Sequence, residues 1–343
     1  MRVMKMRLRK GNSMIAEAGQ ILRDGGLVAF PTETVYGLGA NALDKHAAEK
    51  IYAAKGRPSD NPLIIHISDI ESLSVIARQI PAKALELAKQ YWPGPLTMIF
   101  PKSDIVPSQI TGGLDSVAVR MPDHEIAMQL IKAGGGFIAA PSANTSGRPS
   151  PTKAAHVAED LGDNVDMIID GGDTKIGLES TIVDFASDEI TILRPGAITK
   201  DMIEAVIGPV CQAGDKFIDN DDAPKAPGMK YTHYAPKAPL FIVTGDEASQ
   251  EINKNVQEHM AKGETAGIIC VEDNLNRYSC GVIKSLGKLS DDESIAKHLY
   301  AVLREFDELG VASIYSESFD TPILGVAIMN RLKKAAGGKI IKV

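Results

Sequence analysis

Four cationic side chains stand at the ends of predicted helices and strands, where a ligand can reach them. Lys55 and Arg57 follow an apolar helical pattern, and Arg120 and Arg194 close apolar strand patterns. Arginine binds phosphate oxygens through paired hydrogen bonds, and lysine supplies a compact positive charge. A single lysine or arginine is usually a solvated surface charge. Four at element ends, with Arg148 as a further candidate, favour a site for a polyanion such as a nucleoside triphosphate.

Uncharged polar side chains accompany the same strand patterns. Thr34, Ser142 and Asn144 follow predicted strands, and Ser180 precedes one. Their hydroxyl and amide groups suit a ribose, an amino-acid hydroxyl or a carboxylate, although serine and asparagine also form turns and caps. His66 lies inside an apolar run, so the sequence leaves open whether it is a buried core histidine or a ligand.

Several catalytic motifs are absent from the sequence. It contains no Gly-x-x-x-x-Gly-Lys-Ser/Thr loop, no Gly-x-Ser-x-Gly elbow, no His-Glu-x-x-His pair and no Cys/His metal cluster. No nucleophile stands out. An enzyme with this sequence is therefore expected to work by positioning its substrates and neutralising their charge, without a covalent intermediate.

One glycine-rich segment matches a dinucleotide-binding fingerprint loosely. Residues Gly37–Ala42 read Gly-Leu-Gly-Ala-Asn-Ala, which fits Gly-x-Gly-x-x-Ala. The fingerprint should open directly from a strand, but Pro31–Tyr36 separate this segment from the preceding apolar run. A nicotinamide or flavin site, and with it a dehydrogenase, is therefore an unfavoured alternative.

The elements that must position these residues alternate between strand and helix patterns. Short apolar runs predict strands at 27–30, 63–67, 96–100, 117–120, 137–140, 167–169, 181–183 and 190–193, and helical periods fall at 14–22, 47–54, 81–90, 125–133 and 153–161. This mixed order predicts an α/β domain over residues 1–209 with a twisted, partly antiparallel sheet. Ligands of such sheets bind beyond the carboxyl ends of the strands.

A second, smaller domain follows a change in composition. Residues 210–238 combine an acidic run with several prolines and are predicted to be a linker. The pattern resumes over 239–343, which is predicted to form a βαβ-type domain without a catalytic motif. Its helices are expected to extend from Glu247, to start at the capping box Ser290-x-x-Glu293, and to start at Thr321-Pro322.

Charge and composition exclude several broad classes. The 343 residues carry 37 Lys and Arg against 44 Asp and Glu, a net charge of −7, and 44% of them are hydrophobic. Such a chain can bury a large core, but its acidic balance argues against a dedicated nucleic-acid binder. An RNA-binding or ribosome-associated module is the second function class that we consider.

The sequence also indicates a compartment. Three scattered cysteines cannot form a disulfide framework, no apolar run reaches the ~20 residues that span a bilayer, and no apolar segment follows the basic first ten residues. The expected location is cytoplasmic, without membrane attachment.

Taken together, these segments resemble the threonylcarbamoyl-AMP synthase family in its long, two-domain form. Pro31–Leu38 resembles the opening motif of that family, and Lys55-x-Arg57 with Ser142-x-Asn144 resembles its active-site quartet. The run from Pro227 to Pro236 resembles its interdomain motif, with Ala226 where serine is usual. The resemblance implies a YrdC-like twisted mixed sheet with flanking helices, followed by a smaller Rossmann-like domain.

The resemblance also implies an activity. Members of this family form L-threonylcarbamoyladenylate and diphosphate from L-threonine, bicarbonate or carbon dioxide, and ATP with Mg²⁺. The product supplies the threonylcarbamoyl group that a separate transfer machinery places on adenosine of tRNA. We therefore expect a nucleotidyltransferase that binds no tRNA stably, and no metal site made of protein groups alone.

Site residues carry over from the family onto matching positions. The resemblance implies catalytic roles for Lys55, Arg57, Ser142 and Asn144. It implies an ATP-binding set of Arg57, Asn61, Ser116, Ser142, Ser150, Arg194 and the linker residue Tyr231. It implies a threonine-binding set of Thr34, His66, Arg120, Ala140 through its backbone, and Ser180. Arg120 is the expected partner of the threonine carboxylate. Tyr231, or alternatively Tyr234, is expected to close over the nucleotide, and Lys55 and Arg57 are expected to be exposed in a cleft.

Overall fold

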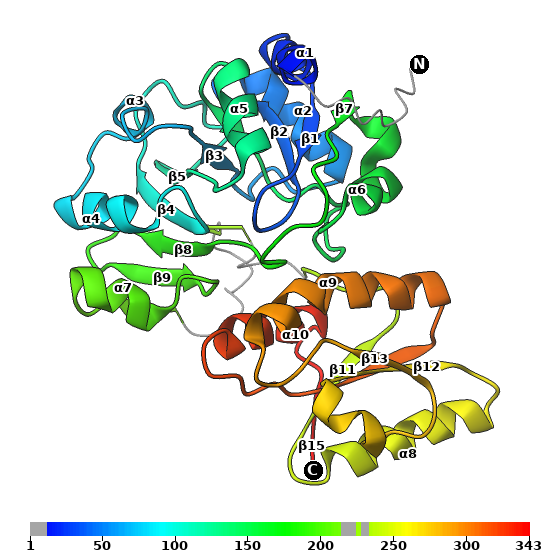
Figure 1. The fold of residues 1–343 in the computed structure, drawn as a ribbon. Coiled ribbons are helices and arrows are strands. Elements are labelled where there is room, and N and C mark those ends of the chain that lie inside the picture. Colours follow the sequence, from blue (N-terminus) through cyan, green and yellow to red (C-terminus); the bar gives the residue numbers. More distant parts are fainter. Residues whose placement is uncertain (1–11, 214–223, 228–232) are drawn as a thin grey trace. The chain divides into compact units, whose positions relative to one another are not determined.

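The computed structural model describes residues 12–213, 224–227 and 233–343. The chain divides into two compact units (Figure 1). The first comprises residues 1–146, 151–175 and 179–231, and the second comprises 147–150, 176–178 and 232–343. The predicted boundary at residue 209 and the linker 210–238 stay predictions, since much of that segment lies outside the described residues. No helix within the described ranges is long and apolar enough to cross a bilayer.

The first unit is built on a mixed ten-stranded sheet, which confirms the predicted α/β class. Its strand order is β10-β9-β8-β4-β5-β3-β6-β2-β1-β7. The strands are β1 (Val28–Phe30), β2 (Gly37–Asn41), β3 (Ile64–His66), β4 (Leu96–Pro101), β5 (Ser116–Arg120), β6 (Ile138–Ala139), β7 (Met167–Ile168), β8 (Thr181–Asp184), β9 (Thr191–Arg194) and β10 (Cys211–Gln212). Parallel and antiparallel pairs alternate irregularly, as the mixed order of the sequence predicts.

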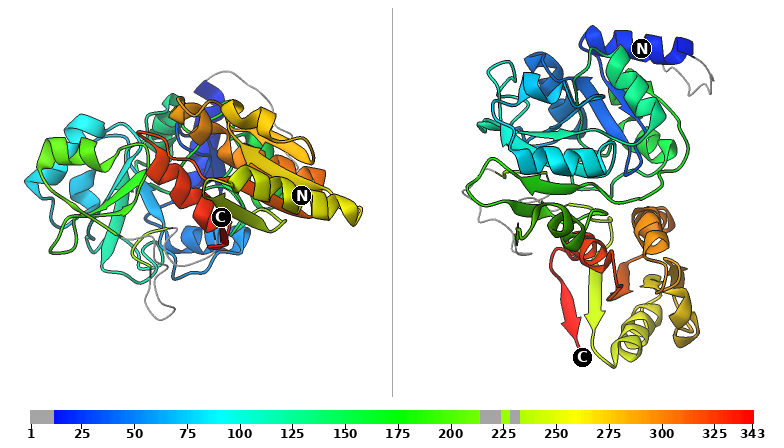
Figure 2. Two further views of the ribbon diagram at one scale, coloured as in Figure 1. Left: turned by 90° about the horizontal axis from the view of Figure 1, so that it is seen from below. Right: turned by 60° about the vertical axis from the view of Figure 1, so that its left-hand side comes forward.

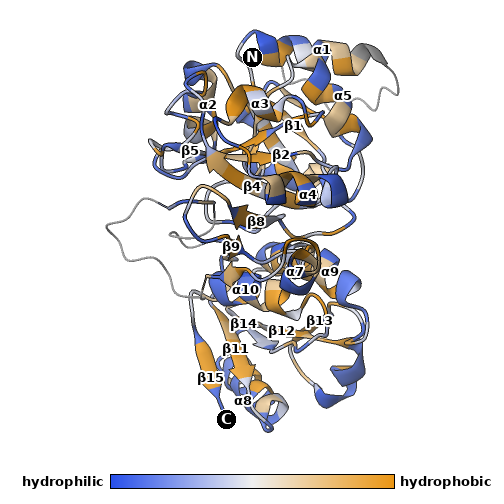
Figure 3. Ribbon diagram, turned by 90° about the vertical axis from the view of Figure 1, so that its left-hand side faces the viewer, coloured by the Kyte–Doolittle hydropathy of each residue, from blue (hydrophilic) through white to orange (hydrophobic). Residues whose placement is uncertain are grey.

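Helices flank this sheet on both sides (Figures 1 and 2). They are α1 (Asn12–Arg23), α2 (Lys45–Lys55), α3 (Leu73–Ile76), α4 (Ala82–Tyr91), α5 (Glu125–Ala133), α6 (Ala154–Leu161) and α7 (Lys200–Ile207). Helices α1 and α5 lie side by side and bury Leu22 and Leu130 against Phe30 and Ile138. On the opposite face, Ile65 and similar strand residues pack with the α2 side chains in the main core. Figure 3 shows the hydrophobic colouring of strand β4 in this sheet.

The end of α2 is fixed by a local signal that the sequence carries. Asp44 caps its first turn by accepting a hydrogen bond from the His46 backbone nitrogen at 2.9 Å. Gly56 ends the helix in the left-handed region at φ 60°, a conformation that glycine adopts without a Cβ penalty. The chain therefore turns sharply between Lys55 and Arg57, and these two side chains contact different segments of the unit.

The structure of strand β2 argues against the alternative that this segment is a dinucleotide-binding fingerprint. Residues Gly37–Asn41 form no phosphate-binding turn but pair antiparallel with β1 and β6. A Cβ on Gly39 would lie 2.8 Å from Cγ2 of Ile138 and 2.9 Å from Cε1 of Phe30. Gly39 is required because two large side chains pack against its backbone. The segment that suggested a dehydrogenase is therefore a packed strand and not a nucleotide-binding motif.

The second unit contains a five-stranded parallel sheet in the order β13-β12-β14-β11-β15. Its elements are β11 (Leu240–Thr244), α8 (Ala248–Ala261), β12 (Ala266–Cys270), β13 (Val282–Ser285), α9 (Asp292–Leu309), β14 (Ser313–Glu317), α10 (Gly325–Ala335) and β15 (Ile340–Lys342). The buried strand β12 and helix α9 form much of its interior. This arrangement is the predicted Rossmann-like domain.

Two predicted helix starts in this unit are wrong. Asp291 caps α9 by accepting from the Ser294 backbone nitrogen, so Ser290 has no capping role. Helix α10 begins at Gly325 and not at Thr321-Pro322. The turn before it is held by Asp292, whose carboxylate accepts from the backbone nitrogens of the two residues that precede Gly325, Ile323 at 2.8 Å and Leu324 at 2.6 Å.

Candidate functional site

Cross-strand pairing places three predicted site residues in one row. His66 on β3 pairs with Arg120 on β5, Arg120 pairs with Thr97 on β4, Thr97 pairs with Ile182 on β8, and Ile182 pairs with Arg194 on β9. Directly paired residues present their side chains on the same face of a sheet. The sheet therefore brings His66, Arg120 and Arg194 to one face, although they are far apart in the sequence.

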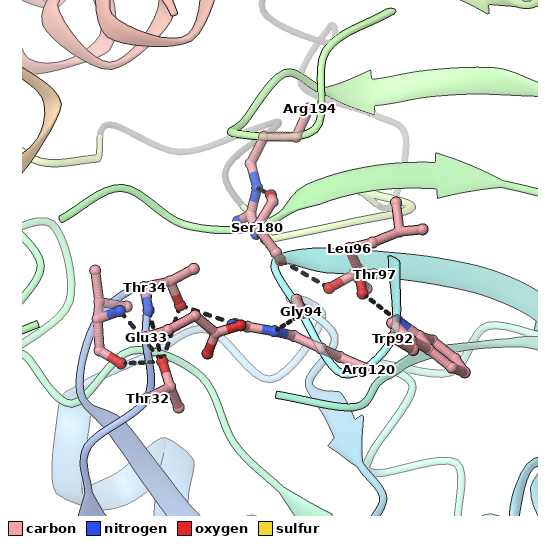
Figure 4. A network of polar contacts seen from close by, with 11 residues as sticks. Thr32, Glu33, Thr34, Trp92, Gly94, Leu96, Thr97, Arg120, Ser180 and Arg194 are labelled. Atoms are coloured by element: carbon pink, nitrogen blue, oxygen red, sulfur yellow. Dashed lines mark hydrogen bonds and ion pairs between the residues drawn. The ribbon is translucent and has the colours of Figure 1, made fainter. Parts of the chain in front are cut away.

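Arg120 is buried and held by contacts from two loops (Figure 4). Its Nη2 lies 2.7 Å from Oε1 of Glu33, its Nη1 donates to Oγ1 of Thr34 at 2.9 Å, and its Nε donates to the carbonyl of Gly94 at 3.3 Å. The side chains of Arg120 and Glu33 are only 5% and 4% exposed. A buried guanidinium needs such a partner, because an unpaired charge is costly away from water.

A hydroxyl-centred turn orients Glu33 and Thr34. Oγ1 of Thr32 donates to the carbonyl of Val35 at 2.6 Å and accepts from the backbone nitrogens of Thr34 and Val35. The Thr32 and Thr34 hydroxyls are 2.9 Å apart. Threonine forms this kind of turn because its short side chain reaches its own backbone. The segment between β1 and β2 therefore presents both residues to Arg120 in a fixed geometry.

Ser180 links two members of the row, Thr97 and Arg194. Its hydroxyl lies 2.7 Å from Oγ1 of Thr97 and accepts from Nη2 of Arg194 at 3.2 Å. The Arg194 Nε donates to the Ser180 carbonyl at 3.0 Å, and its Nη1 donates to the carbonyl of Pro227 at 3.3 Å. Figure 4 shows Ser180 between the side chains of Thr97 and Arg194. Arg194 is thus oriented by contacts along two edges of its guanidinium.

Lys55 meets the predicted quartet partners Ser142 and Asn144. The Lys55 ammonium donates to the backbone carbonyls of both residues, and the Ser142 hydroxyl donates to Oδ1 of Asn144 at 2.6 Å. The Ser142 segment is itself anchored by a bridge to Gly37 at the start of β2. Three members of the predicted quartet therefore lie together.

Arg57, the fourth member, lies with Asn61. Its Nη2 donates to Oδ1 of Asn61 at 2.6 Å and to the carbonyl of Pro62 at 3.0 Å. Ser116 opens β5 two residues before Ala118, which pairs with Ile64. Extending this register brings Ser116 next to Pro62, so it lies toward Arg57 and at the other end of β5 from Arg120.

The expectation that Lys55 and Arg57 are exposed is wrong. Lys55 is 1% exposed and Arg57 is 8% exposed. Lys55 is buried because its ammonium turns inward to the carbonyls of Ser142 and Asn144, and Arg57 is buried because its guanidinium folds back on the Asn61 segment. Buried cations are retained where such acceptors replace water.

His66 is both a core residue and a neighbour of Arg120. Its ring contacts Phe30 edge-on at 6.2 Å between ring centres, and its Nδ1 lies 3.1 Å from the Ile64 carbonyl. Burial, reinforced by the positive charge of Arg120, lowers the pKa of His66 to about 3. The imidazole is therefore uncharged at neutral pH, and it places no second cation beside Arg120.

The remaining predicted residues lie elsewhere or outside the described ranges. Ala140 is buried next to this row, and its backbone nitrogen donates to the Ile64 carbonyl at 2.9 Å. Ser150 and Arg148 belong to the second unit, where Arg148 pairs with Asp307 at 3.3 Å. Tyr231 lies outside the described residues. Tyr234 is buried in the second unit beside Tyr300.

Sequence reasoning missed two residues of this network. Glu33 lies in the motif Pro31–Leu38, and a carboxylate in an otherwise uncharged segment is the signal that could have identified it. Thr97 carries no such signal, because a threonine in a strand is common. Among the described residues, no group of three or more His, Cys, Asp or Glu side chains could hold a metal ion.

Comparisons with known proteins agree along almost the whole chain. Residues 20–196 match a domain family described as "Telomere recombination", and residues 198–337 match the "Threonylcarbamoyl-AMP synthase, C-terminal domain". The threonylcarbamoyl-AMP synthase of Bacillus subtilis is 51% identical over 336 residues, which cover 98% of this chain and 96% of the relative. That of Pyrococcus abyssi is 50% identical over 328 residues, which cover 95% of both.

Solved structures agree with the sequence comparisons. A crystal structure of Pyrococcus abyssi Sua5 complexed with L-threonine has a TM-score of 0.91 and 48% identity, and the match covers 98% of each chain. This similarity extends over nearly all of both units. The chain belongs to the threonylcarbamoyl-AMP synthase family.

Proposed function

We propose that this chain forms L-threonylcarbamoyladenylate and diphosphate from L-threonine, bicarbonate or carbon dioxide, and ATP. Its family membership supports the activity, and a relative with 48% identity has been solved with L-threonine. The observation that carries the proposal is the row of strand partners that sets buried Arg120 and Arg194 on one face of the sheet. One arginine suits the carboxylate of an amino acid and the other suits a polyphosphate.

In the proposed reaction two bonds form in sequence. The threonine amine captures the carbon source and becomes a carbamate. A carbamate oxygen then attacks the α-phosphorus of ATP. The bond between the α-phosphorus and the oxygen that bridges it to the β-phosphate breaks, and diphosphate leaves. Negative charge grows on the phosphate oxygens during this step, so fixed cations accelerate it by stabilising the transition state.

The nucleotide side of the proposed site contains Lys55, Arg57, Ser142 and Asn144. Lys55 and Arg57 would turn toward the phosphates, and the hydroxyl and amide would hold ribose or phosphate oxygens. The remaining members of the proposed nucleotide set are Asn61, Ser116, Ser150, Arg194 and Tyr231. No covalent intermediate on the protein is needed, because positioning and charge neutralisation suffice.

The threonine side of the proposed site is centred on Arg120. Its guanidinium would bind the threonine carboxylate, assisted by the Thr34 hydroxyl. Ser180 and the backbone of Ala140 would contact the remaining polar groups of the amino acid, and uncharged His66 would line the site. These assignments divide the described polar residues into an amino-acid end and a nucleotide end.

Mg²⁺ enters the proposal with ATP. The Ser142 hydroxyl and the Asn144 amide oxygen are ligands that this ion accepts, and the triphosphate would supply most of the remaining oxygens. When bound, the ion would offset part of the charge on the transferred phosphate. Delivery of the product to a separate tRNA-modifying machinery, and a cytoplasmic location, complete the proposal.

The decisive test supplies each substrate in turn. Purified protein is incubated with ATP, labelled bicarbonate and one amino acid, and both the labelled adenylate and diphosphate are measured. Threonine should give equal amounts of the two products. Serine, which lacks one methyl group, should react several-fold more slowly, since a methyl contributes about 1 kcal/mol or slightly more. Diphosphate release that does not depend on an amino acid, or no labelled adenylate, would overturn the proposal.

A further inference from the structure

We propose that Glu33 binds the ammonium group of the amino-acid substrate and accepts one proton from it before carbamate formation. This inference rests on the proposed function, and it assigns the buried carboxylate that the reaction scheme has not used. Glu33 lies beside Arg120, and Figure 4 shows its carboxylate directed at the guanidinium. The amino acid would lie across both side chains.

The Glu33 carboxylate has unused acceptor capacity. The residue is 3% exposed, and neither of its oxygens accepts a hydrogen bond of good geometry from the described residues. The carboxylate forms an ion pair with Arg120, in which Oε1 of Glu33 lies 2.7 Å from Nη2 of the guanidinium. Two carboxylate oxygens offer about four acceptor positions, and leaving them empty in a buried site is unfavourable. An ammonium group, with three N–H donors, can fill them.

The charges of the pair match those of a zwitterion. Arg120 is positive and Glu33 is negative, and the neighbouring His66 is uncharged. A free amino acid carries a negative carboxylate and a positive ammonium group a few ångströms apart. Binding the carboxylate to Arg120 and the ammonium to Glu33 replaces one buried ion pair with two and leaves no net charge. A site made of Arg120 alone would not distinguish an amino acid from any other carboxylate.

The chemistry requires a proton acceptor at this position. Threonine keeps its ammonium proton at neutral pH, and an ammonium nitrogen has no lone pair with which to attack carbon. In the first step the N–H bond breaks and Glu33 becomes a carboxylic acid, which leaves a neutral amine. In the second step the amine and bicarbonate form the carbamate and one water molecule. Glu33 then returns its proton to solvent, so one proton is released per turnover.

His124 is a titratable side chain near Glu33. It precedes α5, is partly exposed, and its Nδ1 is buried without a hydrogen-bond partner among the described residues. Burial lowers the pKa of His124, and the nearby charge of Glu33 opposes this shift. Charged or titratable groups face this region from several elements: Arg120 beside Glu33, His66 beside Arg120, and Lys175, Asp123 and Glu125 around His124.

The test is the pH dependence of Glu33→Gln relative to the unsubstituted protein. Glutamine keeps the shape and can accept from Arg120, but it is uncharged and takes up no proton. At pH 7 the rate with limiting threonine should fall about 100-fold or more. The ratio of variant to unsubstituted rate should then rise about tenfold per pH unit up to about pH 9, because free amine becomes available in solution. Taking the ratio removes the effect of pH on bicarbonate and on ATP.

Other outcomes would overturn the inference. A ratio that is low but independent of pH would mean that Glu33 only positions Arg120, and an unaltered rate would remove it from the reaction. Glu86→Gln, which changes an exposed carboxylate of α4, is the matched control and should retain full activity. If the unsubstituted protein forms no threonylcarbamoyladenylate at any pH, the proposed function fails, and that failure is separate from this one.

A second measurement needs only the unsubstituted protein and remains valid if the Glu33→Gln variant does not fold. 2,3-Dihydroxybutanoate is a threonine analogue in which a hydroxyl replaces the ammonium group. Its binding is compared with that of threonine by calorimetry. The analogue should bind about 100-fold more weakly or worse, because its carboxylate meets the Glu33 charge without a compensating cation. Equal affinities would overturn the inference.

Discussion

In the contacts between described residues, the two ends of the candidate site hold their cations in different ways. At the nucleotide end, Lys55 donates to the carbonyls of Ser142 and Asn144, and Arg57 donates to the amide of Asn61. At the amino-acid end, Arg120 faces the carboxylate of Glu33. Uncharged acceptors orient a cation without cancelling its charge, whereas a carboxylate cancels it.

This difference matches the two proposed ligands. A triphosphate carries several negative charges, so the cations that bind it should keep their full positive charge. A zwitterion carries no net charge, so its site should contain one group of each sign. Whether the acceptor beside a buried cation is neutral or a carboxylate therefore distinguishes an anion site from an amino-acid site within one sheet. Each prediction below tests that distinction.

The largest expected effect is on stability at the amino-acid end. Arg120→Met leaves the Glu33 charge buried without its partner and should lower the free energy of unfolding by about 3–5 kcal/mol. Adding Glu33→Gln should restore much of that loss. Lys55→Met removes a donor to uncharged carbonyls and should cost about 1–3 kcal/mol. Urea denaturation of the four proteins measures these values, and equal losses for Arg120→Met and Lys55→Met would contradict the comparison.

At the nucleotide end the larger effect should be on catalysis. Lys55→Ala should lower turnover by about 100-fold to 1000-fold, since a group that stabilises transition-state charge contributes about that much. Threonine binding should change little, because Lys55 lies with Ser142 and Asn144 and not with Arg120. Adenylate formation and calorimetry measure the two properties. Lys83→Ala, on the exposed side of α4, is the control, and normal turnover by Lys55→Ala would exclude it from the mechanism.

His66 predicts a pH effect with a definite sign. Its pKa is about 3 in the folded chain and about 6.5 when unfolded. Below pH 6.5 the unfolded chain therefore binds a proton that the folded chain does not, and stability falls by about 1.4 kcal/mol per pH unit. His66→Gln should lack this component, so its stability should fall less steeply between pH 6.5 and 4.5. Parallel pH profiles from urea denaturation would show that His66 is not held neutral.

The smallest expected effect concerns the link between the two ends. Thr97→Val removes one hydroxyl from a fully buried position and leaves the Ser180 hydroxyl with its contact from Arg194. The cost should be about 1 kcal/mol, measured as a loss of stability or as a roughly fivefold rise in the KM for threonine. A rise in the KM for ATP alone would assign Ser180 to the nucleotide end instead.

Much of the first unit could be predicted from local patterns. Apolar runs bounded by proline or polar residues identified β3, β4, β5 and β8, because fully buried strands are hydrophobic on both faces. Strand β2 was missed because its glycines have low strand propensity, and the need for Gly39 comes from Phe30 and Ile138, which are distant in sequence. The start of α10 was missed for a similar reason, since Asp292 holds the preceding turn from another helix.

The candidate site shows the same limit. Residue types and their places after strands indicated which side chains carry chemistry, and Lys55 does meet Ser142 and Asn144. Burial could not be predicted, since the acceptors that turn Lys55 and Arg57 inward come from other segments. Glu33 was missed because its importance depends on Arg120, which lies 87 positions later in the chain. Sequence patterns identify the side chains that can react, whereas the folded structure is needed to show which partners surround them and compensate their charges.

The row of strand partners has a further consequence for substrate size. Arg120 and Arg194 are separated by three steps between hydrogen-bonded strands, and each step is ~4.8 Å, so their backbones stand roughly 14 Å apart. Hydrogen-bond geometry sets that interval, and side-chain substitutions leave it unchanged. A ligand must reach from one arginine to the other to engage both. The backbone positions are thus fixed by the sheet, and side-chain reach shortens the gap, since Arg194 extends back to Ser180 beside Thr97, the strand partner of Arg120.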